Sequence, residues 1–309
     1  CQVPLLYVNQ VGGQDELVFD GSSFAISADA HCVLQMPSWQ SALGYVQLKD
    51  HQLSAISASQ LAREDDLASL YQALVLGVRD YVNKNRFPGV VLGLSGGIDS
   101  ALTLAIAADA LGPERVRAVM MPFTYTSDMS KTDASLQAEA MGIRYESISI
   151  EPMYREFMAG LSDNFAGLAV DTTEENLQSR CRGVLLMALS NKTGYMVLTT
   201  GNKSEMAVGY ATLYGDMAGG YGALKDVYKT KVFALADYRN SISPIIPQRV
   251  IDRPPSAELA PDQKDEDSLP PYPVLDSILE RYIEHDDSAD SIVAAGYERE
   301  DVMRVIRLV

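Results

Sequence analysis

Short apolar runs alternate with longer amphipathic segments along most of the chain beyond Gly89. The short runs are bounded by turn-forming residues, as buried strands are, and the longer segments repeat their apolar positions at helical spacing. Strands that are apolar throughout and alternate with helices indicate a parallel sheet covered on both faces, that is, a doubly wound α/β fold. The predicted strands are 90–94, 116–121, 144–150 and 195–200, and the predicted helices are 98–111, 131–141, 173–191 and one starting near 203.

The beginning of the chain has a different, β-rich pattern. Strand-like stretches at 5–11 and 17–26 flank the turn-forming segment 12–15, and a polar stretch follows them. A unit of this size is too small to fold alone, so we expect it to be part of a larger one. The sequence therefore predicts three parts: a β-rich remnant at 1–50, a linker at 51–60 and a second domain at 61–309.

The second domain is predicted to open with an amphipathic helix at 61–84. One face of that helix carries a stripe of apolar residues: Leu67, Leu70, Leu74 and Val78. Thr172, with Glu175 three residues later, fits a capping box for the helix at 173–191. The segment 253–273 is rich in proline and acidic residues, which predicts an extended loop or lid.

The composition indicates a soluble globular protein with a strong acidic excess. The formal net charge of −16 disfavours nucleic acid as a partner, because lysine and arginine supply most of the affinity for phosphate backbones. No apolar run approaches the roughly 20 residues that cross a bilayer, and no signal segment opens the chain, so no membrane partner is expected. Cys1, Cys32 and Cys181 are scattered and lack paired spacing, which favours a reducing cytoplasm over a disulfide framework or zinc site.

The strongest local signal is a glycine-rich turn, Ser-Gly-Gly-Ile-Asp-Ser at 95–100, between a buried strand and a helix. Polyphosphates bind at such turns, because the N–H groups and the positive end of the helix dipole point toward them. Gly96 and Gly97 allow close backbone approach, and Asp99 can hold a Mg²⁺ ion that bridges phosphates. The turn lacks the Gly-Lys-Ser/Thr of a Walker loop, so a different class of nucleotide site is predicted.

This turn resembles that of the N-type ATP pyrophosphatases, which split ATP between its α and β phosphates to adenylate a carboxylate or carbonyl oxygen. The fold implied by the resemblance is Rossmann-like, of the adenine nucleotide alpha hydrolase type. Further segments resemble the NAD synthetases and extend the likeness over essentially all of 61–309. They are Glu-Glu-Asn-Leu-Gln-Ser-Arg at 174–180, Thr-Thr-Gly-Asn-Lys-Ser-Glu at 199–205, Tyr-Gly-Asp at 214–216 and Arg-Pro-Pro-Ser-Ala-Glu-Leu at 253–259.

The opening segment at 4–21 looks like the last part of a nitrilase-type glutaminase domain. Together the two parts resemble the glutamine-dependent NAD synthetases, in which the first domain releases ammonia from glutamine and the second uses it. In that family the nitrilase Cys, Glu and Lys lie upstream of this segment. We therefore expect the chain to be a piece of a longer polypeptide. The nitrogen donor is expected to be ammonia for this piece and glutamine for the full-length enzyme.

The resemblance implies a role for individual residues. Asp99 and Lys229 are the catalytic candidates, with Lys229 neutralising the pyrophosphate leaving group, and Asp99 and Glu205 are the Mg²⁺ ligands. The ATP-binding candidates are Gly93, Leu94, Ser95, Gly96, Gly97, Ile98, Asp99, Ser100 and Thr200. The candidates for binding the dinucleotide substrate are Asn176, Arg180, Glu205 and Asp216.

The reaction implied is the ATP-dependent amidation of deamido-NAD (nicotinate adenine dinucleotide) to NAD through an adenylated intermediate, with release of AMP and pyrophosphate. The implied assembly is a homodimer or larger homo-oligomer. Two alternatives stay open: another N-type ATP pyrophosphatase, such as a GMP synthetase-like or tRNA-modifying enzyme, and a nucleotide-binding module without catalysis. A nitrilase-type amidase is not expected, because its catalytic residues are missing from the sequence.

Overall fold

The computed structural model of the protein describes residues 2–56, 65–215, 217–260, 263 and 265–309. The chain divides into two compact units, Cys1–Arg86 and Phe87–Val309. We describe each unit by itself.

The first unit consists of antiparallel strands and one long helix. Its three-stranded sheet has the order β1-β4-β5, and two hairpins, β2-β3 and β6-β7, accompany it. The bounds are β1 Leu5–Tyr7, β2 Val11–Gln14, β3 Leu17–Asp20, β4 Phe24–Ile26, β5 Cys32–Gln35, β6 Val46–Lys49, β7 Gln52–Ala55 and α1 Asp66–Lys84.

The turn predicted at 12–15 lies later in the structure. Gly12 and Gly13 belong to strand β2, and the two-residue turn is Asp15 and Glu16. The glycines are needed for close packing on helix α1, because a Cβ at Gly13 would lie 3.2 Å from the Asp80 Cβ atom. The backbone N–H of Gly13 also donates to the Asp80 carboxylate over 2.9 Å.

The linker predicted at 51–60 is partly a strand. Residues 46–55 form the β6-β7 hairpin, because Leu53 is buried with Ala25 and Leu34 in a small apolar core. Residues 57–60 lie outside the described part of the chain, as do residues 61–64 of the predicted helix. The buried face of α1 also differs from the prediction. Of the predicted apolar stripe only Val78 is buried, and the other buried side chains of the helix are Tyr71, Val75, Leu76 and Val82.

The second unit is built on a five-stranded parallel sheet with the order β10-β9-β8-β11-β12. This order confirms the doubly wound α/β fold, and only the short strand β12 was not predicted. The strands are β8 Val90–Gly93, β9 Val116–Met120, β10 Arg144–Ser147, β11 Met196–Thr199 and β12 Tyr221–Gly222. The strand order reverses between β8 and β11, and ligands of such sheets bind at the carboxyl ends of the strands at this point.

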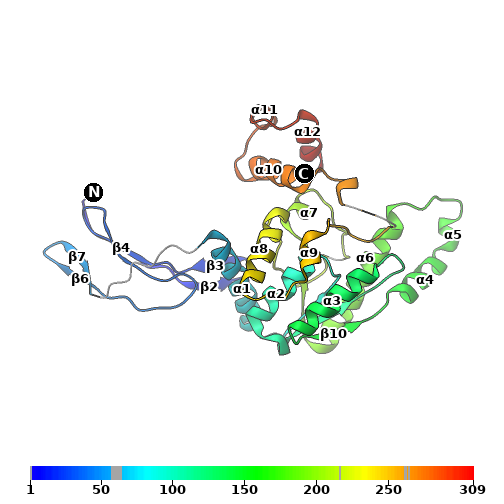
Figure 1. Ribbon diagram of the computed structural model, residues 1–309, viewed down its shortest axis with the longest axis horizontal. Helices are drawn as coiled ribbons and strands as arrows, with labels where there is room; N and C mark the ends of the chain where they lie inside the picture. Colours follow the sequence, from blue (N-terminus) through cyan, green and yellow to red (C-terminus); the bar gives the residue numbers. More distant parts are fainter. Residues whose placement is uncertain (1, 57–64, 216, 261–262, 264) are drawn as a thin grey trace. The chain divides into compact units, whose positions relative to one another are not determined.

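Helices cover both faces of the parallel sheet (Figure 1). On one face, α6 (Thr172–Thr193) packs against one valine from each of three neighbouring strands: Val91 of β8, Val119 of β9 and Val197 of β11. On the other face, α2 (Ile98–Leu111) lies between the sheet and α8 (Lys229–Ile242). Because α2 is buried on both sides, its sequence is apolar nearly all round, and its bounds match the prediction.

The start of α6 differs from the prediction by one residue. Asp171 rather than Thr172 is the N-cap, and Glu174 rather than Glu175 completes the capping box. The two candidate pairs have the same spacing, and aspartate is the stronger N-cap residue of the two. The capping box still lies at the N-terminus of the predicted helix, which carries Asn176 and Arg180.

The remaining helices follow the strands and close the C-terminal part of the unit. They are a 3₁₀ turn Pro113–Arg115, α3 Asp128–Ala140, α4 Glu151–Gly160, α5 Ser162–Phe165, α7 Lys203–Ala207, α9 Gln248–Asp252, a 3₁₀ turn Asp265–Asp267, α10 Tyr272–Leu279, a π-helical turn Glu280–Glu284, α11 Ala289–Ala294 and α12 Arg299–Leu308. α10 packs with α11, α12 and the end of α7 around its own apolar core, centred on Leu275, Ile278 and Leu279. Among the described residues, no helix combines the length and apolar character that a bilayer crossing requires.

Candidate active site

A cavity of about 220 Å³ lies where the strand order of the second unit reverses. The ends of the neighbouring strands β8 and β11 line it, together with the glycine-rich turn after β8 and the segment 253–259. One part of its wall is apolar, formed by Met121, Leu186, Leu198 and Met217. An apolar wall beside a glycine-rich turn at a helix N-terminus suits an adenine nucleotide, because the faces of the aromatic base pack on apolar side chains and free N–H groups bind phosphates.

The glycine-rich turn is held in shape by hydrogen bonds of its own. The buried Ser100 hydroxyl donates to the Gly97 carbonyl over 3.0 Å and accepts from the Ser95 N–H over 3.2 Å. The Ser100 hydroxyl therefore shapes the turn. Gly97 is the N-cap of α2 and has no side chain to cover the first N–H groups of the helix. The positive end of the helix dipole thus faces the cavity.

Gly96 must be glycine for two reasons. Its φ of +83° lies in the left-handed region, and a Cβ atom there would approach the Ser130 backbone oxygen to 2.3 Å. The glycine-rich turn therefore packs closely against the first turn of α3.

Replacing Gly96 by alanine is expected to destabilise the second unit and to weaken ATP binding. The backbone conformation alone costs about 1–3 kcal/mol, and relief of the contact with Ser130 must move the turn. Thermal unfolding and ATP titration measure the two effects. Gly160→Ala is the control, because a Cβ atom there meets nothing within 4 Å; equal melting temperatures and ATP affinities for the two variants would contradict this interpretation.

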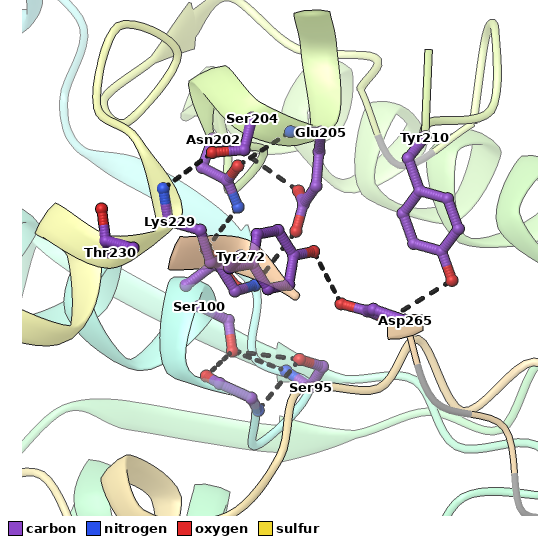
Figure 2. A network of polar contacts seen from close by, with 12 residues as sticks. Ser95, Ser100, Asn202, Ser204, Glu205, Tyr210, Lys229, Thr230, Asp265 and Tyr272 are labelled. Carbon is purple, nitrogen blue, oxygen red and sulfur yellow. Dashed lines mark hydrogen bonds and ion pairs between the residues drawn. The ribbon is translucent and has the colours of Figure 1, made fainter. Parts of the chain in front are cut away.

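A buried lysine joins the two acidic candidates of the site (Figure 2). The Lys229 Nζ atom lies 2.5 Å from Asp99 Oδ2 and 3.1 Å from Glu205 Oε1. Only 2% of Lys229 is exposed, so the ammonium group is shielded from water by the protein. Asp99 lies in the first turn of α2, after β8, and Glu205 lies in α7, after β11. The adjacent strands thus bring together the two carboxylates that the resemblance implied as Mg²⁺ ligands.

The charges of this cluster shift one another's proton affinity. Burial, together with the neighbouring Asp99 charge, raises the pKa of Glu205 to about 7. Burial acts to lower the pKa of Lys229, but the Asp99 and Glu205 carboxylates outweigh it and raise that pKa above the ordinary lysine value. Lys229 is therefore a fixed cation, while Glu205 can exchange a proton near neutral pH.

Asn202 ties the acidic residues to the fold. Its side-chain oxygen caps α7 by accepting from the Glu205 N–H over 3.0 Å, and its Nδ2 atom donates to Asp99 Oδ1 over 2.8 Å. A third buried carboxylate, Asp265, accepts from the Tyr272 hydroxyl over 2.9 Å and the Tyr210 hydroxyl over 3.3 Å. Burial raises the pKa of Asp265 as well.

The segment predicted as a loop or lid lies on the glycine-rich turn. Arg253 donates to the Gly96 carbonyl and, over 3.0 Å, to the Ser130 hydroxyl. Glu258 accepts from the hydroxyls of Ser127, over 3.0 Å, and Ser130, over 2.7 Å. These contacts bring residues 253–259 to the wall of the cavity. Residues 261, 262 and 264 lie outside the described part of the chain.

Most of the predicted site residues line the cavity. They are Gly93, Leu94, Ser95, Gly97, Ile98, Asp99, Ser100, Thr200, Glu205 and Lys229, while Gly96 forms the turn beside them. Two dinucleotide candidates are absent from this lining: Asn176 accepts from the Thr212 hydroxyl over 2.8 Å, and the Arg180 Nε atom donates to the Leu213 carbonyl over 3.3 Å. Asp216 lies outside the described residues. The roles of all these residues stay predictions.

Other cavity residues were missed by the sequence reasoning. Ser130 and Arg182 point to no chemistry in their local sequence, since one looks like a helix residue and the other like a surface arginine. Asp265 and Glu258 lie in the segment 253–273 that was predicted to be a loop or lid. Glu258 also stands in the segment 253–259 that carries the family resemblance, but no role was assigned to either residue. Their placement depends on contacts between distant parts of the chain.

The donor set fits Mg²⁺ bound together with a polyphosphate. No group of three or more His, Cys, Asp or Glu side chains suited to a metal occurs in the described residues. Mg²⁺ commonly uses one or two carboxylates and takes its other ligands from phosphates and water. Asp99 and Glu205 supply two such carboxylates, and both now accept from the Lys229 ammonium group.

Comparisons with known proteins give matches in both sequence and fold. Residues 70–309 match the family described as NAD synthase. The chain is 57% identical to a glutamine-dependent NAD(+) synthetase of Acinetobacter baylyi, over 99% of this chain and 57% of the relative. It therefore spans little more than half the length of this curated relative.

Two solved structures are also similar. One is a glutamine-dependent NAD+ synthetase from Acinetobacter baumannii in complex with ADP, which is 51% identical over 99% of this chain and 56% of that one, with a TM-score of 0.78. The other is an NMN synthetase from Francisella tularensis, which is 27% identical over 79% of this chain and 93% of that one, with a TM-score of 0.66.

Proposed function

Because the chain belongs to the NAD synthase family, we propose that it catalyses the ATP-dependent amidation of deamido-NAD to NAD, with release of AMP and pyrophosphate. Glutamine is the nitrogen donor of the whole protein in this proposal, and ammonia is the species that reacts at the site described above. The name of the relative with 57% identity supports the substrates and the nitrogen donor. In this proposal the β-rich segment 1–50 is the end of a nitrilase-type glutaminase domain, and the synthetase domain is 61–309. Helix α1 (Asp66–Lys84) then belongs to the synthetase domain, although by its contacts it is part of the first compact unit.

The observation that carries the proposal is the position of Lys229. Its buried ammonium group lies between Asp99 and Glu205, and Asp99 belongs to the first turn of α2, directly after the glycine-rich turn. Adenylation separates the α phosphate of ATP from a pyrophosphate group that gains negative charge in the transition state. A fixed cation that is shielded from water stabilises such charge far more than an exposed one does.

The proposed reaction has two steps. The nicotinate carboxylate attacks the α phosphate, the bond between the α phosphorus and the bridging oxygen breaks, and pyrophosphate leaves. Ammonia then attacks the activated carbonyl carbon, AMP leaves with one of the original carboxylate oxygens, and the amine loses a proton. The chain provides no nucleophile in this scheme; its residues position the substrates and stabilise charge.

Each part of the cavity has a role in this scheme. The N–H groups at the start of α2 bind phosphate oxygens, and the apolar wall near Leu186 takes the adenine base. Lys229 neutralises the leaving pyrophosphate. Mg²⁺, held by Asp99 and Glu205 together with the phosphates, would neutralise further phosphate charge. Residues 253–259 exclude water when they lie over the nucleotide.

The finer points of the proposal concern assembly and location. Asn176, Arg180 and Asp216 are proposed to bind the dinucleotide near the contact between two copies of the synthetase domain, in a homodimer or larger homo-oligomer. The exposed apolar side chains Val184, Leu213 and Tyr214, on α6 and in the loop beside it, support such a contact. A cytoplasmic location is proposed as well, and the free thiols Cys32 and Cys181 support it.

The substrate is tested by offering alternative acceptors with ATP, Mg²⁺ and ammonium. We expect NAD and AMP from deamido-NAD at a rate at least about a hundredfold above that with nicotinate mononucleotide or xanthosine monophosphate, because a mononucleotide leaves the polar groups that bind the other half of the dinucleotide unpaired. The mononucleotide is included because the Francisella neighbour is an NMN synthetase. A faster reaction with either mononucleotide would overturn the assignment of deamido-NAD.

A further inference from the structure

Asp276 is a buried carboxylate that contacts the first turns of two helices of the site. It lies in α10, and only 5% of it is exposed. Its Oδ1 atom accepts from the Ser204 hydroxyl over 2.5 Å, and its Oδ2 atom accepts from the Thr230 backbone N–H over 2.8 Å. Ser204 belongs to α7 and Thr230 to α8, so one carboxylate holds the beginnings of both helices.

The residues next to these contacts are the charged residues of the site. Ser204 precedes Glu205, and Thr230 follows Lys229 (Figure 2). The Ser204 hydroxyl also accepts from the backbone N–H of Lys229 over 2.8 Å. A continuous chain of hydrogen bonds therefore runs from Asp276 through Ser204 to the backbone of Lys229. The backbone N–H of the next residue, Thr230, donates directly to Asp276.

Anchoring of α10 does not by itself explain an aspartate at this position. α10 is held by the apolar side chains Leu275, Ile278 and Leu279, which are fully buried. A carboxylate in such surroundings is costly unless it is hydrogen-bonded. Its two bonds serve α7 and α8, and α8 lacks a side-chain cap from its own N-cap residue, Tyr228. Asp276 thus supplies from another helix the negative charge that favours the start of α8.

We propose that Asp276 is a positioning residue for the adenylation reaction: through Ser204 and Thr230 it fixes the backbone that carries Lys229 and Glu205, and so sets the spacing of the ammonium group to the two carboxylates. The inference rests on the proposed function. It goes beyond it because Asp276 is not one of the residues that line the cavity, and its hydrogen bonds to Ser204 and Thr230 would act on the reaction through the helices that it joins.

The kinetic test compares Asp276→Asn, Ser204→Ala and the double variant in the full-length protein, with deamido-NAD, ATP, Mg²⁺ and saturating ammonium. Each single change is expected to lower kcat at least tenfold and to leave the KM for ATP within threefold, because the phosphate turn is untouched. The double variant is expected to be no slower than the slower single variant, since both changes break one hydrogen-bond chain.

Glu284→Gln is the matched control. Glu284 binds the starts of the same two helices, through the side chains of Lys203 in α7 and of Tyr228, the N-cap of α8. The partners of Asp276 are instead Ser204 and Thr230. The kcat of Glu284→Gln is expected to stay within twofold of the wild-type value. An unchanged kcat in Asp276→Asn, or the same loss of kcat in Glu284→Gln, would overturn the proposal.

A second measurement does not depend on activity. Hydrogen exchange of the peptides that contain residues 203–205 and 229–232 is expected to be at least tenfold faster in Asp276→Asn than in Glu284→Gln. Equal exchange in the two variants would refute the positioning role, whatever the kinetics. A wild-type protein that forms no NAD would refute the proposed function instead, and the exchange comparison would still decide whether Asp276 orders the two helix starts. If Asp276→Asn does not fold, Ser204→Ala gives the same comparison.

Discussion

Replacing Lys229 by methionine is expected to lower kcat by about a hundredfold to a thousandfold, the range found when a preorganised charge-stabilising group is removed. Methionine keeps much of the length and volume of the side chain but removes the ammonium group that lies between Asp99 and Glu205. The leaving pyrophosphate then lacks its buried counter-charge. Single-turnover measurement of AMP formation gives the rate of the step that should be affected.

Lys231→Met is the control for this change. Lys231 lies in the same helix, two residues further on, with an exposed side chain, so the substitution makes the same chemical change away from the cavity. Its rate is expected to stay within about twofold of the wild-type rate, because surface substitutions of this kind have small effects. Equal rates for Lys229→Met and wild type would remove Lys229 from the mechanism.

The same variant should change the pH dependence of stability. The pKa of Glu205 is raised from 4.5 to about 7 in the folded protein, so the stability it contributes is present at low pH and is lost as the pH rises through about 7. Lys229 acts to lower that pKa. Without Lys229 the loss is expected to continue to higher pH, because the pKa of Glu205 in the folded protein rises further while its pKa in the unfolded chain stays the same. Thermal unfolding of the wild-type protein and of Lys229→Met, measured without Mg²⁺ at pH values on both sides of 7, shows how stability depends on pH in each. Coincident stability profiles for the two proteins would contradict this prediction.

Replacing Asp99 by asparagine is expected to reduce Mg²⁺-dependent turnover by at least about a hundredfold while the fold is kept. The asparagine oxygen can still accept from Asn202, as Asp99 Oδ1 does over 2.8 Å. The amide lacks the charge that pairs with Lys229 and that a Mg²⁺ ion requires of its ligand. Turnover measured over a Mg²⁺ titration should show a lower maximum and a higher half-saturating concentration.

Asp109→Asn provides the comparison for Asp99→Asn. Asp109 lies in the last part of the same helix, where it pairs with Arg239. The change breaks an ion pair on α2 without touching the cavity, so turnover and its Mg²⁺ dependence are expected to match the wild type. Normal turnover in Asp99→Asn would refute the role assigned to Asp99.

The parallel sheet and its phosphate turn could be predicted because their signals are local. The apolar run at 90–93 and the glycines before Ile98 specify a strand, a turn and a helix from adjacent residues. The two residues of β12, Tyr221 and Gly222, are too few for a periodicity, so that strand was missed. The buried face of α1 was mispredicted, because leucines that are only half-buried gave the same spacing as the buried residues beside them.

The site was predictable only where its residues stand in recognisable segments. Asp99, Glu205 and Lys229 were predicted from a family resemblance, and the structure brings them within hydrogen-bonding distance. Asp276 and Ser204 are 72 residues apart and carry no local pattern, so their contact follows only from the packing of α10 on α7 and α8. Such long-range polar contacts depend on the whole fold, which a local pattern does not contain.

The most direct test of the proposed chemistry follows oxygen from the substrate. Deamido-NAD labelled with ¹⁸O in its nicotinate carboxylate is incubated with the full-length protein, ATP, Mg²⁺ and ammonium, and the products are analysed by mass spectrometry. Adenylation of the carboxylate predicts AMP with one labelled oxygen and unlabelled pyrophosphate, because AMP leaves with an oxygen of the carboxylate. Unlabelled AMP, or ADP with label in inorganic phosphate, would contradict the attack of the carboxylate on the α phosphate.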